Sequence, residues 1–156
     1  MKVVRLNNFF GAEVQGIDLR NLSRKAINDL QRLWLEYKVL VVRNQSLTSK
    51  EHVNFSKHFG DLEIHPFAKK HDDYQEILVL ESGGLTGKTH YSATDWHSDV
   101  TYREKPPMGS ILRGVVVPEV GGDTCFANAV EAYNRLDLET KSAISELTAT
   151  HDWFKK

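Results

Sequence analysis

The apolar positions in the first third of the chain follow the periods of short strands and two helices. Alternating apolar residues at 3–6 and 12–19 predict two strands. Ser23 can cap a helix that runs to about Tyr37, with an apolar face at helical spacing. That face consists of Ile27, Leu30, Leu33, Trp34 and Tyr37. The β-branched run at 39–42 predicts a short buried strand.

A second helix is predicted after residue 48. Thr48 and Glu51 have the spacing of a capping box, in which each residue satisfies a backbone N–H of the other. Val53, Phe55 and Phe59 would face partly inward, and Gly60 is a natural stop.

The rest of the chain is predicted to contain short strands, tight turns and two more helices. Strand patterns fall at 77–80, 96–101, 110–117 and 124–127, and a polar, glycine-containing loop occupies 81–94. Asn128 with Glu131 is a possible helix cap ahead of 130–136, and another helix covers 139–147. Helices followed by strands and turns predict a single α+β or mainly β domain over residues 1–156.

Composition supports a globular domain and argues against several other classes. The chain has 156 residues, 40% hydrophobic and 26% charged, with a net charge of −1. It has no basic stripe, so nucleic acid is not an expected partner, and no run of about 20 apolar residues that would span a membrane. The one cysteine, Cys125, is expected to be a small buried hydrophobe. A reducing, cytoplasmic location fits this cysteine usage.

The first candidate for chemistry is the pair His97 and Asp99. On a strand, residues two apart point to the same face, so an imidazole and a carboxylate would converge. They would supply two of the three ligands of a 2-His-1-carboxylate site, which binds Fe(II) and leaves positions open. Among seven histidines, however, one such spacing is weak evidence. Taken alone, such a pair is more often a surface hydrogen bond or a turn than part of a metal site.

Further motifs occur along the chain in a fixed order. They are Gly11-Ala12-Glu13-Val14, Gly16-Ile17-Asp18-Leu19, Phe59-Gly60-Asp61-Leu62, Ile64-His65-Pro66, Trp96-His97-Ser98-Asp99-Val100-Thr101, Pro106-Pro107, Gly121-Gly122-Asp123-Thr124 and His151-Asp152. Together they resemble the taurine dioxygenase (TauD/TfdA-type) family of Fe(II)- and 2-oxoglutarate-dependent dioxygenases. The resemblance covers essentially the whole chain and corresponds to the N-terminal half of such a domain.

The resemblance implies a fold, two cofactors and roles for four residues. The fold would be part of a double-stranded β-helix, or jelly roll, with flanking helices. The reaction would hydroxylate a small acidic substrate with O2, using Fe(II) and 2-oxoglutarate and releasing succinate and CO2. His97 and Asp99 carry over as iron ligands, Thr124 as the residue that hydrogen-bonds a carboxylate of 2-oxoglutarate, and His65 as a contact to the substrate's acidic group.

Each of these roles has a plainer alternative. Without the family, Thr124 fits a turn threonine after Gly-Gly, and His65 fits a loop histidine before a proline. Ala68 and Ala93 stand where the taurine enzyme has a tyrosine and an asparagine, so taurine itself is not implied. The loop at 81–94 is expected to act as a lid, and Trp96 is expected to pack in the core.

The family's third iron ligand and its 2-oxoglutarate-binding arginine have no counterpart in these residues. His151 matches a structural His-Asp pair of the family and is not expected to bind metal. The chain would then be a fragment of a longer dioxygenase, a protein that assembles with a second chain or with itself as a homo-oligomer, or a non-catalytic remnant. A zinc-dependent, cupin-like hydrolase or isomerase is a further alternative.

Overall fold

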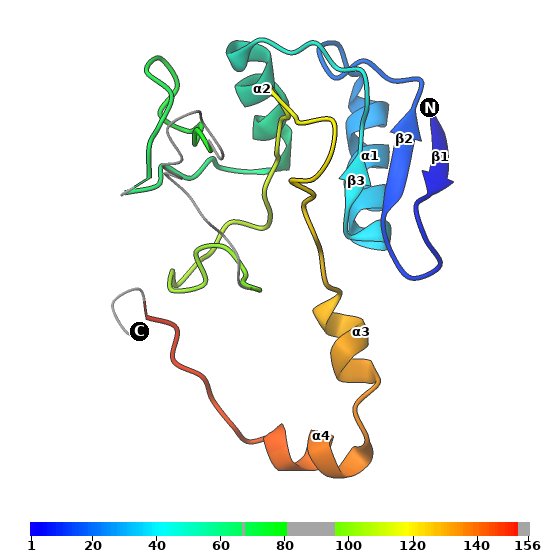
Figure 1. The fold of residues 1–156 in the computed structure, drawn as a ribbon, viewed down its shortest axis with the longest axis vertical. Coiled ribbons are helices and arrows are strands. Elements are labelled where there is room, and N and C mark those ends of the chain that lie inside the picture. Colours follow the sequence, from blue (N-terminus) through cyan, green and yellow to red (C-terminus); the bar gives the residue numbers. More distant parts are fainter. Residues whose placement is uncertain (67, 81–95, 153–156) are drawn as a thin grey trace. The chain divides into compact units, whose positions relative to one another are not determined.

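A computed structural model describes residues 1–66, 68–80 and 96–152, and these form two compact units (Figure 1). The first unit comprises Met1–Ile17, Asp29–Arg43 and Arg113–Lys156, and the second comprises Asp18–Asn28 and Asn44–Leu112. The predicted loop at 81–94, with Ala93, lies outside the described residues.

The first unit is built on a small mixed sheet with the strand order β1-β2-β3 (Figure 1). Strand β1 (Lys2–Arg5) is antiparallel to β2 (Ala12–Gln15), and β2 is parallel to β3 (Leu40–Val41). The predicted strand at 12–19 therefore stops at residue 15. Gly16 follows it with a φ of +70°, a left-handed backbone that glycine adopts without a steric cost.

Helix α1 (Arg24–Tyr37) and strand β2 supply the buried apolar side chains of this unit. Leu30 and Leu33 are 2% and 5% exposed, and Ala12 and Val14 are 0% and 1% exposed. The predicted apolar face of the helix is therefore confirmed. The N–H of Gly11 donates to the carbonyl of Tyr37 over 2.8 Å, which ties the end of α1 to the start of β2.

The second unit contains helix α2 (Ser49–Ser56) and the 3-10 turn η1 (Lys57–Phe59). Both halves of the predicted capping box are present, because the Thr48 side chain accepts from the backbone of Glu51 and the Glu51 side chain accepts from the backbone of Thr48. Val53 and Phe55 are buried. Gly60 ends the element with a φ of +127°, as its position predicted.

Four predicted strands are wrong for the described part of the chain. Residues 77–80 contribute only an isolated bridge between Lys70 and Leu78. Residues 96–98 have no regular secondary structure and 99–101 form a turn, and 110–117 and 124–127 form no strand. The physical reason is that a strand requires a hydrogen-bonded neighbouring strand. Among the described residues, 77–80 has only the bridge to Lys70, and the other three segments pair with no strand.

Two short helices follow in the first unit, α3 (Ala129–Asn134) and α4 (Leu138–Ile144) (Figure 1). The Asn128 side chain accepts from the N–H groups of Val130 and Glu131, which confirms the predicted cap. Asp137 caps α4, so this helix starts one residue before the predicted boundary. None of the helices in the described residues has the length and apolarity needed to cross a bilayer.

Candidate functional site

His97 and Asp99 approach each other in the second unit. The Nε2 atom of His97 lies 3.3 Å from Oδ1 of Asp99, and the two side chains are 47% and 54% exposed. They converge at a turn and not on a strand. Val100 has a φ of +48°, and the N–H of Arg103 donates to its carbonyl over 3.0 Å.

The spacing of these two donor atoms suits adjacent positions on an octahedral metal ion. With metal–ligand bonds of about 2.1 Å, two ligands at a right angle lie about 3.0 Å apart. The observed 3.3 Å is close to that value. One imidazole nitrogen and one carboxylate oxygen are also the donor types of a non-haem Fe(II) site. The described residues contain no group of three or more His, Cys, Asp or Glu side chains placed to hold a metal, so these two residues form at most part of a site.

Ser110 holds the second oxygen of the Asp99 carboxylate. Its hydroxyl donates to Oδ2 over 2.8 Å. The next residue, Ile111, accepts through its carbonyl from Nε2 of His52 on α2, over 3.2 Å. A carbonyl can only accept, so the proton of this hydrogen bond is on Nε2. Sequence reasoning missed this role of Ser110, because nothing in the local pattern links a serine to a carboxylate eleven residues earlier.

An ion pair connects the His65 segment to the turn that follows Asp99. The guanidinium of Arg103 lies 2.6 Å from the carboxylate of Glu63, two residues before His65. His65 itself is half-buried, and its Nδ1 accepts from the backbone N–H of Ala68 over 3.1 Å. The sequence did not single out either member of this ion pair.

Thr124 lies in the first unit, on exposed backbone after the Gly121-Gly122 turn. Both glycines have a positive φ, +80° and +73°, which confirms the predicted turn. A role for Thr124 in binding 2-oxoglutarate stays a prediction. Two expectations of burial are wrong: Trp96 is 72% exposed, and Cys125 is also exposed. Neighbouring segments of the described chain do not cover either side chain.

The Gly16–Leu19 motif is structural in this chain. The carboxylate of Asp18 accepts from the guanidinium and the backbone N–H of Arg20, and these bonds lower its pKa to about 2. The backbone N–H of Leu19 donates to the Gln45 side chain over 2.9 Å. These contacts hold residues 18–20, the first of the second unit, next to Gln45.

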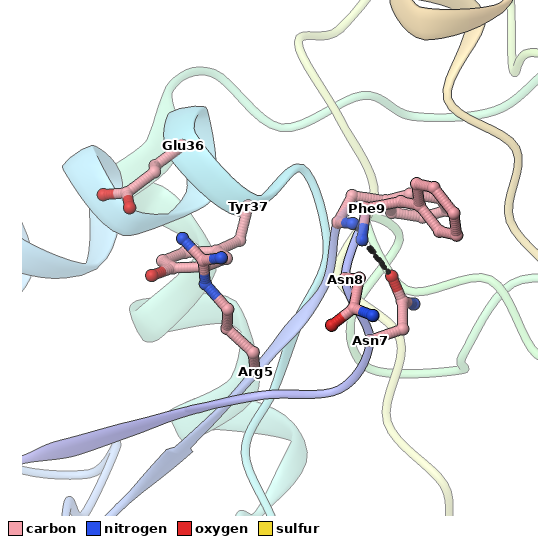
Figure 2. Close-up of a pocket in the computed structure, with 7 residues that line it drawn as sticks. Arg5, Asn7, Asn8, Phe9, Glu36 and Tyr37 are labelled. Atoms are coloured by element: carbon pink, nitrogen blue, oxygen red, sulfur yellow. Dashed lines mark hydrogen bonds between the residues drawn. The ribbon is translucent and has the colours of Figure 1, made fainter.

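A pocket of about 240 Å³ lies in the first unit, at the loop between β1 and β2 (Figure 2). It is lined by Arg5, Asn7, Asn8, Phe9, Phe10, Glu36 and Tyr37. Figure 2 shows the Arg5 guanidinium against the ring of Tyr37. Its Cζ atom lies 5.8 Å from the ring centroid. Its lining has one carboxylate and no histidine, so it lacks the donor set of the His97–Asp99 pair.

Comparison with known proteins shows the family of the chain that carries the His97–Asp99 pair. The family model described as taurine catabolism dioxygenase TauD, TfdA family matches residues 2–156. The chain belongs to this TauD/TfdA family. The resemblance predicted from the motifs is thereby confirmed, and it identifies an enzyme family whose members depend on Fe(II) and 2-oxoglutarate.

Several TauD/TfdA-family relatives are similar over nearly the whole chain. An (S)-phenoxypropionate/alpha-ketoglutarate-dioxygenase of Sphingobium herbicidovorans is 33% identical, covering 96% of this chain and 52% of the relative. An alpha-ketoglutarate-dependent sulfonate dioxygenase of Saccharomyces cerevisiae is 31% identical, covering 97% and 39%. The crystal structure of a taurine dioxygenase from Burkholderia xenovorans aligns with a TM-score of 0.79 at 32% identity, covering 93% of this chain and 51% of that one. The chain thus spans about half the length of these relatives.

Proposed function

We propose that this chain supplies the N-terminal half of an Fe(II)- and 2-oxoglutarate-dependent dioxygenase that hydroxylates a small acidic organic substrate with release of succinate and CO2. The observation that carries the proposal is the 3.3 Å approach of His97 Nε2 to Asp99 Oδ1, in a chain that matches the family throughout. These two residues would hold the iron. Together with 2-oxoglutarate and O2, the iron would supply the oxidising chemistry.

Two other residues have roles that suit their position and chemistry. The Thr124 hydroxyl is a donor that can hydrogen-bond a carboxylate of 2-oxoglutarate. In His65, Nδ1 accepts from Ala68, so in the neutral ring the proton is on Nε2. That N–H is a donor suited to an anionic group on a substrate.

The names of the relatives support an acidic substrate. They include dioxygenases of phenoxypropionate, sulfonates, sulfate esters and 2,4-dichlorophenoxyacetate, and each of these compounds carries an anionic group. Ala68, whose N–H donates to His65, has a smaller side chain than the tyrosine of the taurine enzyme. We therefore favour a substrate bulkier than taurine.

The fold proposal follows from the segments that have no partner strands. Four valines near the end of the 110–117 segment are 70% to 92% exposed: Val115, Val116, Val117 and Val120. An apolar run of this kind suits a strand once neighbours are present. We propose that 110–117 and 124–127 become strands of a jelly roll when the polypeptide corresponding to the other half of the relatives packs against them.

The test is an anaerobic titration of the purified chain with Fe(II) and 2-oxoglutarate, read by the weak visible charge-transfer band of the chelate. A saturable band in the parent chain, lost in His97→Ala and kept in His58→Ala, is the expected result. His58 is an exposed histidine of η1, so it controls for loss of an imidazole. Persistence of the band in His97→Ala would refute the site. The absence of any band in the parent chain would refute an iron site formed by these 156 residues alone.

The exposed valines also favour a second candidate function, a non-catalytic remnant that self-associates. Unpaired apolar strand segments invite pairing between copies. Analytical ultracentrifugation of the parent and of Val116→Lys distinguishes the two candidates. Association that Val116→Lys abolishes, in a chain that binds no iron, would support the remnant. A monomeric parent would exclude it.

A further inference from the structure

The two oxygens of the Asp99 carboxylate have different environments. Oδ1 lies 3.3 Å from Nε2 of His97, whereas Oδ2 accepts from the Ser110 hydroxyl over 2.8 Å. A free carboxylate on an exposed side chain rotates about its last bond and exchanges its two oxygens. The Ser110 hydrogen bond opposes that rotation, because a hydroxyl bonded to a carboxylate is a strong, charge-assisted donor.

Ser110 is itself held by the fold. The neighbouring Ile111 carbonyl accepts from His52 of α2 over 3.2 Å, and α2 is anchored by the buried Val53 and Phe55. The hydroxyl thus reaches Asp99 from a segment attached to a capped helix. This attachment to α2 is additional to the connection through the chain between Asp99 and Ser110.

From this geometry we propose that Ser110 is a positioning residue, which fixes Oδ1 of Asp99 as the oxygen presented to the metal. The proposal rests on the proposed function, since it assigns Ser110 a task at the same iron site. By occupying Oδ2, the hydroxyl favours binding of the metal through one carboxylate oxygen and leaves more coordination positions for 2-oxoglutarate and O2. It also gives Oδ2 a hydrogen-bond donor.

The expected size of the effect comes from other metal sites. Removing a side chain that hydrogen-bonds a metal ligand weakens metal affinity by about 10- to 100-fold. The exposure of Asp99 allows water to replace the lost hydroxyl in part. We therefore expect Ser110→Ala to bind a divalent metal about 10-fold more weakly, at the lower end of that range.

The experiment measures Mn(II) affinity by electron paramagnetic resonance in the parent chain and three serine variants, without 2-oxoglutarate or turnover. Ser110→Ala should lose about 10-fold in affinity. Ser110→Thr should retain parent affinity, because it keeps the hydroxyl and the site is exposed enough for the extra methyl group. Ser98→Ala is the matched control, because it also removes a serine hydroxyl, at the position between the two ligands. Its Mn(II) affinity should equal that of the parent. Urea unfolding of each variant reports whether the fold has changed.

The outcomes separate this proposal from the proposed function. Equal Mn(II) affinity in the parent and Ser110→Ala would overturn the role of Ser110 and leave the His97–Asp99 site intact. Equal weakening in Ser110→Thr and Ser110→Ala, with lower unfolding midpoints in both, would overturn it in favour of a packing role. No binding by the parent, or binding unchanged in His97→Ala, would overturn both the metal site and the role assigned to Ser110.

Discussion

The ion pair between Glu63 and Arg103 joins two segments that the proposed site requires, so breaking it tests whether the second unit holds them together. The two charged groups are 40 residues apart in sequence and 2.6 Å apart in space. Their side chains are 32% and 42% exposed, respectively. The perturbation is a double-mutant cycle made of Glu63→Gln, Arg103→Met and the double variant. Each substitution removes a charge and preserves most of the side-chain shape.

The coupling free energy can be bounded from this geometry. Two unit charges whose centres are about 4 Å apart attract by about 1 kcal/mol in water and about 4 kcal/mol at an effective dielectric constant of 20. Both side chains reach solvent, so the larger value is strongly discounted. Exposed pairs measured by such cycles give about 0.2–1 kcal/mol. The short contact places this pair near the upper end, at about 0.5–1 kcal/mol.

The assay is urea unfolding of the four proteins at low and high salt. The coupling should fall toward zero at about 1 M NaCl, where the Debye length is about 3 Å. Arg32 and Glu36 on α1 provide a matched control cycle, with a contact of 3.7 Å and side chains that are 66% and 48% exposed. Their coupling should be smaller, about 0.3–0.5 kcal/mol.

Two results would refute this reasoning. A coupling between Glu63 and Arg103 that is zero within error would mean that the contact does not hold the segments in solution. A coupling that is unchanged by salt would mean that packing, and not charge, is responsible. If the pair positions the His65 segment, Glu63→Gln should also weaken binding of an anionic substrate more than it weakens binding of Mn(II).

Two further predictions concern the fold. Leu30→Ala should destabilise the chain by about 2–5 kcal/mol in urea unfolding, because it empties a buried core position, and Leu30 is 2% exposed. Leu35→Ala on the same helix, at a side chain that is 64% exposed, should change stability by less than about 0.5 kcal/mol, and similar effects of the two would contradict the assigned core. Asp18 has its pKa lowered to about 2 by the guanidinium and backbone N–H of Arg20, so its contribution to stability should be fully present above its ordinary value of 3.8 and be lost as the pH falls through about 2. Carboxyl-carbon NMR titration should show this pKa returning toward 3.8 in Arg20→Met, and an unchanged pKa would disprove the cause.

The elements predicted correctly are those whose determinants lie within a few residues. Helix α1 follows from apolar side chains three and four apart, and α2 follows from the reciprocal bonds of Thr48 and Glu51. Asn128 similarly identified the start of α3. These signals are local, so they can be read without knowing what the element packs against.

The strand predictions were wrong because strands depend on residues far away in the sequence. Residues 110–117 have strand composition, but a strand exists only when another segment accepts its hydrogen bonds. No strand of the described residues pairs with 110–117, and this chain covers only about half of the length of its relatives. Composition alone does not reveal that dependence.

In the candidate site, too, some residues could be identified from the sequence and others could not. The motif order identified His97 and Asp99, whose side chains do converge. Ser110 and the Glu63–Arg103 pair depend on contacts across 11 and 40 residues, and serine, glutamate and arginine are common on any surface. Only the three-dimensional arrangement distinguishes them from solvated side chains.

The donor atoms of His97 and Asp99 meet at a turn, although a strand would also place the two side chains on one face. The Nε2 and Oδ1 atoms are 3.3 Å apart in this turn. Val100, directly after Asp99, has a φ of +48°, which is unusual for a β-branched residue. Backbone strain of this kind costs about 1–3 kcal/mol and gathers at functional sites. Under the proposed function, a turn that brings two donor atoms to nearly the separation of adjacent metal ligands would give a physical reason for this sequence to tolerate such strain.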